Sequence, residues 1–578
     1  MTRPKRPAIR ILLLAMAALA LPALHAEEQP VVNSAMSGQL LYEVLVGEIS
    51  ADNGDVAASF QLILDAARKS HEPQLFERAI DIALRAHAGD SALEAAQAWY
   101  RITPSSPAAT RYLLQILVGL NRLPETVKPL RQALTNPSAE ERLIVVRQVP
   151  RIFARAADKV AAAATVERAL ADALTDPETS AAAYVAVASM RLLAGDAPGT
   201  LQAAGKSAEL DPLAPEPALL ALELMGPEPG PAEALVLASL EHKLHADVAM
   251  GLVRKLLDLQ RFEDARSWAE KLTQEQPELA DAWLVRGSLA LQNKKVALAE
   301  TSLHKFLELQ QAKAAPAGTE EEASRASGQA YLMLAQIAAQ RKAWDEAQQD
   351  LNQVDDPDAA LRVVAQRADI LARQGKLAQA RELIRNAPEA QPEDARVKLA
   401  LEAELLRDQQ QFQAVYRLLQ DDLPAYAQDP DYVYDLAMAA DKLGKEAEAE
   451  QLLRRVMVLK PDYYHAYNAL GYALADRKVR LSEARELIAH ALQYAPNDPY
   501  VIDSMGWVEF RSGNVEQAAR LLQAAFHNRP DPEIAAHLGE VFWTLKQTQQ
   551  AKAVWQEGLD MAPDNETLND TLRRLNKP

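Results

Sequence analysis

The chain is 578 residues long, 49% of them hydrophobic and 5% aromatic, with a formal net charge of −18 at pH 7. An apolar content drawn mainly from Ala and Leu is typical of a large, nearly all-helical protein. The absence of Cys excludes disulfides, thiolate zinc sites and cysteine nucleophiles. The acidic balance argues against nucleic acid and anionic membranes as partners, and its simplest role is solubility.

The first 26 residues have the layout of a secretory signal peptide. Four basic residues between Arg3 and Arg10 precede an apolar run from Ile11 to Leu21, and small residues lead to Ala26. The run is short for a membrane span, so we expect cleavage after Ala26 and export to the periplasm, with an uncleaved anchor as the alternative. Cleavage leaves 58 Lys and Arg against 80 Asp and Glu, a charge of −22. No lipid anchor is expected, because lipidation at such a junction needs a Cys.

Residues 27–225 are predicted to form an N-terminal array of paired helices. Weak copies of a repeat with a period of about 34 residues recur there, each with apolar and small residues at helical spacing and a closing Pro. Two copies contain Phe76, Ala79, Ala83, Ala92, Ala96 and Pro104, and Tyr184, Val187, Ala188, Gly195 and Pro212. The stretch from 105 to 180 is expected to be helical but carries few of these marks.

Two interruptions follow. The segment GPEPGPAEA at 226–234 is rich in Pro and Gly, which helices do not tolerate, and it is the predicted boundary between two halves. Central units are expected at 235–311, and AKAAPAGTEEEASRA at 312–326 is predicted to be an inserted linker with solvated acids. His242 and His245 would share a helix face, but surface histidines are the simpler interpretation, and no metal site is predicted.

Residues 327–565 carry the repeat most clearly, and 566–578 are expected to form a capping helix or tail. Small residues at the eighth and twentieth places of each unit let two antiparallel helices approach closely, and Pro ends the second helix. The four consecutive copies contain Val433, Leu436, Ala437, Ala449, Leu453, Val456 and Pro461; Tyr467, Leu470, Gly471, Ala484, Ile488, Ala491 and Pro496; Ile502, Met505, Gly506, Ala518, Leu522, Ala525 and Pro530; and Leu538, Gly539, Phe542, Ala551, Trp555 and Pro563.

This pattern resembles the tetratricopeptide repeat. The resemblance implies an all-α solenoid in which antiparallel helix pairs stack into a right-handed superhelix, with roughly 12 to 15 units in this chain. The sequence contains no G-x-S-x-G elbow, no H-E-x-x-H and no Gly-rich phosphate loop after a strand. We therefore expect a binding protein with no catalytic residues, cofactor or metal.

The candidate binding site is the concave groove, which the first helix of each unit lines. The predicted partner-binding residues are Tyr434, Met438, His465, Asn468, Tyr472, Asp503, Trp507, Phe510, Arg511 and Trp543, with Asp431, Asp476, Tyr500, Glu533 and Glu540 beside them. Aromatic and Arg side chains are frequent anchors at interfaces. The alternative for the two Trp is that they pack in the core between helices. A cochaperone-type clamp on a peptide carboxyl terminus is disfavoured, because among its Lys and Asn positions only Asn468 fits.

Two segments resemble a narrower group. They are LLYEVLVGEISADNGDVAASFQLILDAARKSHEPQLFERAIDIALRA, at 40–86, and DPYVIDSMGWVEFRSGNVEQAARLLQAAF, at 498–526. Both are similar to proteobacterial outer-membrane lipoproteins of the LbcA type, which bind a periplasmic carboxyl-terminal processing protease. The resemblance implies an adaptor that holds the protease and presents its substrates, although this chain lacks the Cys that would tether it. The alternative is a scaffold for polysaccharide export or other envelope biogenesis, and an enzyme is the remote one.

Overall fold

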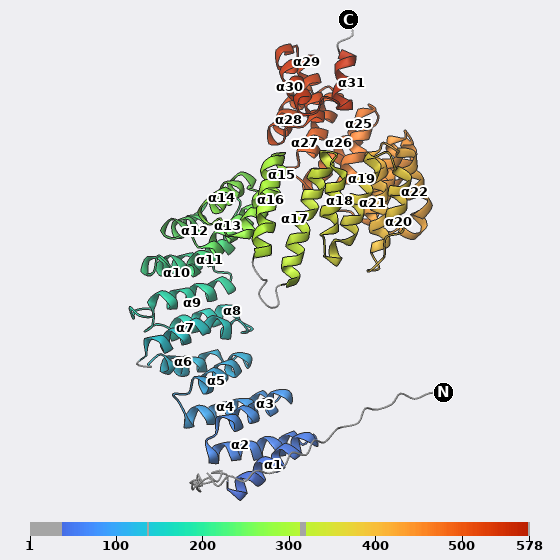
Figure 1. The fold of residues 1–578 in the computed structure, drawn as a ribbon. Coiled ribbons are helices and arrows are strands. Elements are labelled where there is room, and N and C mark those ends of the chain that lie inside the picture. The colour runs from blue at the N-terminus through green and yellow to red at the C-terminus, as the bar shows by residue number, and fades with distance from the viewer. Residues whose placement is uncertain (1–36, 136–137, 313–319, 576–578) are drawn as a thin grey trace, which may run out of the picture. The chain divides into compact units, whose positions relative to one another are not determined.

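The computed structural model describes residues 37–135, 138–312 and 320–575. Across these ranges the chain is all-α, and helix follows helix without an intervening strand (Figure 1). This confirms the expected fold class, an α-solenoid of helix pairs. The predicted signal peptide, its cleavage site and the alternative anchor lie outside the described residues. Among the helices of the described ranges, none combines the length and apolar character needed to span a bilayer.

The chain divides into two compact units, one ending at Glu275 and the other beginning at Gln276. The sequence placed this division at 226–234, whereas residues 226–230 form a loop inside the first unit. The helices on either side of that loop pack against each other, so the stack continues across it.

The helices of the first unit follow in chain order (Figure 1). They are α1 (Gly38–Asp52), α2 (Val56–Ser70), α3 (Pro73–Arg85), α4 (Gly89–Ile102), α5 (Pro107–Gly119), the 3₁₀ helix η1 (Leu123–Thr126), α6 (Val127–Ala133), α7 (Ala139–Phe153), α8 (Lys159–Ala169), α9 (Ser180–Leu193), α10 (Ala197–Leu210), α11 (Glu216–Glu223), α12 (Pro231–His242), α13 (Ala246–Asp258) and α14 (Phe262–Glu275).

The second unit continues the same pattern. Its helices are α15 (Ala280–Gln292), α16 (Val296–Ala312), α17 (Glu320–Gln340), α18 (Trp344–Asn352), the 3₁₀ helix η2 (Pro357–Ala359), α19 (Ala360–Arg373), α20 (Leu377–Arg385), α21 (Asp394–Asp408), α22 (Phe412–Tyr426), α23 (Pro430–Lys442), α24 (Glu446–Leu459), α25 (Tyr464–Asp476), α26 (Leu481–Tyr494), α27 (Pro499–Arg511), α28 (Val515–Asn528), α29 (Pro532–Thr544), α30 (Thr548–Met561) and α31 (Glu566–Leu575).

Most odd-numbered helices pack on the helix that follows, as in α1 with α2, α9 with α10 and α27 with α28. The stretch that lacked clear repeat marks departs from this rule. There α7 packs on α5 and α9, while α8 packs on α6 and α9. The region is helical, as expected, but its helices are paired less regularly than in the rest of the chain.

Glycine at the eighth place of the repeat sets the close approach within the C-terminal pairs. A Cβ atom on Gly471 would lie 2.5 Å from Ile488 Cγ1, and one on Gly506 would lie 2.7 Å from Leu522 Cγ. On Gly539 it would lie 2.0 Å from the indole nitrogen of Trp555. The predicted reason for these small residues is confirmed, because a side chain there would push the second helix away.

Asp followed by Pro begins three of the groove helices. Asp429, Asp498 and Asp531 each accept hydrogen bonds from two backbone N–H groups of the first turn, and the Pro that follows needs no partner for a missing N–H. At the other end, the second helices stop at Leu459, Tyr494, Asn528 and Met561, just before the repeat's Pro. These signals fix where each pair begins and ends.

The corner between the two helices of most pairs contains a residue with positive φ. Some corners use Gly, such as Gly444 (φ 71) and Gly513 (φ 92), and others use Lys294 (φ 58) or Lys546 (φ 63). The corner from α25 to α26 is one residue longer than its neighbours and has two positive-φ residues, Lys478 and Arg480. The extra residue of this unit is therefore accommodated in the corner, at Arg480.

Part of the predicted linker at 312–326 is helical. Residues 313–319 lie outside the described residues, but α17 begins at Glu320, so 320–326 form its first two turns. Glu320, Glu321 and Glu322 occupy the first turn, where the helix dipole favours negative charge. Arg325 pairs with Glu321 one turn later. The acids are exposed, as expected, but they start a helix and do not belong to a linker.

Candidate functional site

The ten predicted groove residues lie on four successive first helices, α23, α25, α27 and α29, in the second unit. Seven of them are half-buried, which suits side chains that line a groove, and His465 is exposed. Trp507 and Asp503 differ, with 3% and 6% of their surface exposed. The structure places Trp507 in the core between helices, which was the alternative for this residue, so a partner in the groove would not contact it directly.

Tyrosine side chains form one cluster at the start of the groove. Tyr434 lies against Tyr463, with ring centroids 5.4 Å apart, and 6.4 Å from the ring of His465. The Tyr463 hydroxyl donates to Asp431 Oδ1 at 2.7 Å. Burial raises the pKa of Tyr434 to about 12, so its hydroxyl remains a hydrogen-bond donor at neutral pH.

A second cluster centres on His537 and is called the His537 network here. Nδ1 of His537 lies 3.0 Å from both carboxylate oxygens of Asp503, one helix earlier. Its Nε2 lies 3.2 Å from the hydroxyl of Tyr472, two helices earlier. The indole of Trp507 stacks on the imidazole at a centroid distance of 4.2 Å. One buried side chain thus connects three successive first helices.

The network reaches the surface through Asp476. The Trp507 indole N–H donates to Asp476 Oδ1 at 3.2 Å, and Arg511 Nη2 donates to the same residue's backbone oxygen at 2.6 Å. Phe510 packs against Trp507 at 5.3 Å between centroids. The half-buried side chains Arg511 and Phe510 are therefore held in place by Trp507 and Asp476.

Two opposing effects act on the pKa of His537. Burial lowers it, but the charge of Asp503 and the hydrogen bond to it raise it, and the balance is a raised pKa. Burial also raises the pKa values of Asp435 and Asp441 on α23. The region is rich in carboxyl groups, with Asp431 and Asp476 exposed.

The remaining predicted residues are less connected. Met438 is half-buried, and Trp543 packs on Trp555 at 5.7 Å between ring centroids. The side-chain oxygen of Asn468 is buried without a hydrogen-bond partner in the described part of the chain. Glu540, expected beside the groove, is 5% exposed and pairs with Arg574 of α31.

Sequence reasoning did not single out His537. The 34-residue period could have indicated this pair, because His537 lies 34 residues after Asp503 and so has the same place in the next unit. Tyr463 was missed because it precedes the first residue of α25.

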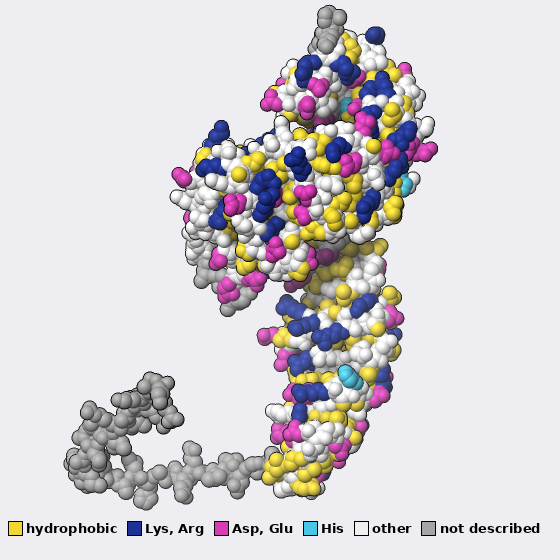
Figure 2. Space-filling model, turned by 90° about the vertical axis from the view of Figure 1, so that its right-hand side faces the viewer, with side chains coloured by type: hydrophobic (Ala, Val, Ile, Leu, Met, Phe, Trp, Pro, Cys, Tyr) yellow, Lys and Arg dark blue, Asp and Glu magenta, His cyan; other side chains and the backbone are white. Residues whose placement is uncertain are grey.

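Another surface lies on α1. Leu41, Tyr42, Leu45 and Ile49 are between 46% and 64% exposed. Figure 2 shows apolar side chains gathered at this end of the first unit. Clusters of this kind mark interaction sites more often than single exposed residues do.

The described ranges hold no group of three or more His, Asp or Glu arranged to bind a metal ion. His242 and His245 do not share a helix face as the sequence suggested. His242 ends α12, whereas His245 precedes α13 and its Nε2 lies 2.8 Å from the backbone oxygen of Leu213.

Comparisons with known proteins point to the repeat. Residues 250–318, 434–499 and 504–566 match the tetratricopeptide repeat family model. The chain is 36% identical over 211 residues to TPR repeat-containing protein PA4667 of Pseudomonas aeruginosa, which is 36% of each chain. It is 42% identical over 78 residues to PsbB mRNA maturation factor Mbb1, chloroplastic, of Chlamydomonas reinhardtii, 13% of this chain and 12% of that one. The matched parts thus span only 36% and 12% of these relatives.

Solved structures give lower similarity. TTC0263, a thermophilic TPR protein of Thermus thermophilus, is 24% identical and covers 30% of this chain and 95% of its own, with a TM-score of 0.28. The APC/C hetero-tetramer Cut9–Hcn1 is 14% identical and covers 86% of this chain and 95% of its own, with a TM-score of 0.32.

Proposed function

This chain carries tetratricopeptide repeats, and from that premise we propose that it is an exported scaffold that binds protein partners in the groove of its C-terminal repeats. Stacked repeats expose a long surface on which a partner can lie across several units. The observation that carries the proposal is the row of half-buried aromatic side chains on successive first helices, Tyr434, Tyr472 and Phe510. Such side chains bury a large area at little cost in rotamer freedom. The role requires no chemical step by the chain itself.

The His537 network gives this groove its preorganisation. Because it links three first helices, the side chains that it supports keep their positions before a partner arrives, and little ordering entropy remains to be lost. The exposed face of α1 provides a second place where a partner of the scaffold would bind.

A finer proposal names the partner and the compartment. The leader at 1–26 supports export to the periplasm. The two segments at 40–86 and 498–526 support a carboxyl-terminal processing protease and its substrates as partners. In this role the scaffold would hold the protease and the substrate together and raise their effective concentration.

Affinity capture tests the scaffold role. The mature chain without residues 1–26 is immobilised and exposed to an envelope extract, and captured proteins are identified by mass spectrometry. We expect a stoichiometric protein partner whose capture falls when Tyr434 or Phe510 is changed to Ala. Tyr494→Ala is the matched control, because Tyr494 is a 51% exposed tyrosine on the second helix α26.

The outcomes are distinct. Capture of a processing protease supports the finer proposal, whereas capture of polysaccharide-export proteins supports an envelope-biogenesis scaffold. Capture unchanged by both groove variants would place the interface elsewhere.

For the leader, N-terminal sequencing of the exported protein is expected to begin at Glu27 or within a few residues of it. A chain that still begins at Met1 would support an uncleaved anchor.

A further inference from the structure

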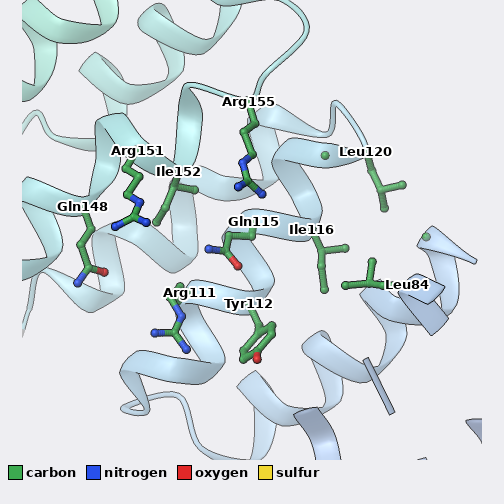
Figure 3. A pocket seen from close by; sticks show the side chains of 12 residues that line it. Leu84, Arg111, Tyr112, Gln115, Ile116, Leu120, Gln148, Arg151, Ile152 and Arg155 are labelled. Atoms are coloured by element: carbon green, nitrogen blue, oxygen red, sulfur yellow. The ribbon is translucent and has the colours of Figure 1, made fainter. Parts of the chain in front are cut away.

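Two adjoining hollows lie in the first unit, where the repeat is least regular. The first has a volume of about 720 Å³ and lies chiefly between α5 and α7 (Figure 3). The second, of about 700 Å³, shares Arg111, Gln148 and Ile152 with it. Together the two form one groove, called the α5–α7 groove here. This groove lies where α7 packs on α5 and α9, so the helices here depart from regular pairs.

Three arginines line the first hollow. Arg111 lies on α5, Arg151 on α7 and Arg155 just beyond α7. All three are exposed, and within the described ranges none of them forms an ion pair or hydrogen bond through its guanidinium group. Elsewhere in the first unit Arg191 is paired with Glu167 at 2.9 Å, whereas the guanidinium carbon of Arg111 lies 5.4 Å from the ring centroid of Tyr112. The three guanidinium groups thus have no carboxylate partner within the described ranges.

Carboxylates are missing from the same hollow. None of its 12 lining residues is Asp or Glu, although the chain has 80 acids against 62 Lys and Arg. The neighbouring hollow contributes a single one, Glu141. A cluster of positive charge in an acidic protein attracts a carboxylate ligand, and Arg binds carboxylates in a bidentate manner.

The rest of the lining suits a peptide. Ile116, Leu120 and Ile152 form an apolar floor, and Figure 3 shows Gln115 and Gln148 among the arginines. An amide side chain can both donate to and accept from an extended peptide backbone. The net charge of −18 repels a long polyanion, so a short segment with a few carboxylates fits better than nucleic acid.

We propose that the α5–α7 groove binds an extended, acidic peptide segment with interspersed apolar side chains. Its carboxylates pair with Arg111, Arg151 and Arg155, and its apolar side chains lie on the isoleucine and leucine floor. This inference rests on the proposed scaffold function, because it assumes a protein ligand. It adds a site separate from the aromatic groove of the second unit and names the chemistry of its ligand.

Fluorescence polarisation with labelled peptides tests the site. The probes are an alternating Asp/Leu peptide, its Asn/Leu counterpart and a Lys/Leu peptide, all with blocked termini so that no terminal carboxylate contributes. The full mature chain should bind the Asp/Leu peptide at least about tenfold more tightly than the Asn/Leu peptide, the range for charge-assisted hydrogen bonds. Added salt should weaken that binding.

Arginine variants locate the binding. Arg111→Gln and Arg151→Gln should each weaken Asp/Leu binding about tenfold, and their melting temperatures should match the parent, since both side chains are exposed. Arg147→Gln is the matched control, because Arg147 is exposed on α7 and lines neither hollow. It should bind like the parent.

Several outcomes would overturn the inference. These are equal affinity for the Asp and Asn peptides, equal loss in the Arg147 and Arg151 variants, or displacement of the peptide by inorganic phosphate at constant ionic strength, which would indicate a simple anion site. Failure here with capture still dependent on Tyr434 would leave the scaffold proposal standing. Peptide binding in the α5–α7 groove without any captured partner would support this inference and contradict the scaffold proposal.

Discussion

Single glycines set the distance between the two helices in three of the C-terminal pairs. Gly471, Gly506 and Gly539 occupy the same place in successive units, and each faces a large side chain of the second helix. The sequence allowed this prediction because the period is visible in it and only small residues recur at that place.

Gly539→Ala should lower the free energy of unfolding of the C-terminal repeats by about 1 to 3 kcal/mol, the usual range for overpacking. The added Cβ would overlap Trp555, which is itself buried. Calorimetric melting gives the measurement. Gly205→Ala in α10 is the control, because nothing lies within 4 Å of a Cβ there and removing a helical glycine stabilises by about 0.5 to 1 kcal/mol.

Trp507→Ala is expected to reduce stability by about 3 to 5 kcal/mol, because it opens a cavity under the groove. Phe510→Ala, at a half-buried position, should instead weaken partner binding by about 1 to 3 kcal/mol. Chemical denaturation and partner titration on both variants distinguish the two effects. A Trp507 variant that melts like the parent would contradict its assignment to the core.

The raised pKa of His537 predicts that the stability of the fold depends on pH. Its pKa is raised in the folded state, so its stabilising contribution is fully present below about pH 6.5 and is lost as the pH rises through the folded value. Asp503, Glu533 and Asp476 are the nearby carboxyl groups that raise this pKa. Denaturation between about pH 5.5 and about pH 8.5 should show a loss of stability that His537→Gln lacks. The same slope in both proteins would contradict this.

The site was less predictable than the fold at the residue scale. The helical period predicts which face of a helix a residue occupies. It does not predict whether a side chain from a neighbouring unit buries that residue. Trp507 has a groove position, yet the imidazole of His537 from the next unit stacks on it. Arg111 and Arg151 lie 40 positions apart in weakly marked repeats, so no motif could bring them together before the packing of α5 and α7 was known.

At the scale of elements, α31 is a single helix that follows the pair of α29 and α30. It packs on α29 and α30, and its Leu568 is fully buried. Arg574 pairs with the buried carboxylate of Glu540 on α29. The sequence predicted a capping helix or tail at 566–578, and within that range α31 is helical from Glu566 to Leu575.

Arg574→Ala should therefore destabilise the C-terminal repeats by about 1 to 3 kcal/mol, because it leaves the Glu540 carboxylate buried without its ion-pair partner. Arg573→Ala is the matched control on the same helix, since the ion pair of Arg573 with its neighbour Asp570 joins two largely exposed side chains. Thermal melting of the two variants gives the comparison. Equal shifts would show that the buried ion pair contributes nothing specific.

Element boundaries were predictable where caps and Pro were strong and less so elsewhere. The Asp–Pro starts of α23, α27 and α29 and the Pro after each second helix coincide with the repeat marks. The segment at 320–326 was misassigned because AAPAG upstream has loop composition, while the acids that follow are favourable in the first turn of a helix.

At the scale of the whole molecule, stability in a stacked array comes from interactions between neighbouring repeats. The division after Glu275 separates two sets of internal contacts. We expect the fragments 37–275 and 276–578 to keep helical circular dichroism spectra when produced separately. The full chain should unfold in more than one transition. A fragment without helical signal, or one sharp transition for the full chain, would contradict this.

The positive-φ corners are positions at which the thermal stability of the protein can be raised by substitution. Left-handed backbone is unfavourable for residues with a Cβ by about 1 kcal/mol, and Lys294, Lys342 and Lys546 adopt it where other corners use Gly. Replacing these lysines by Gly should raise the thermal midpoint in small, roughly additive steps, because the corners are far apart along the array. All three changes lie outside the aromatic groove and the arginine cluster. A thermostable version of the scaffold with unaltered recognition surfaces is thus within reach of a few substitutions.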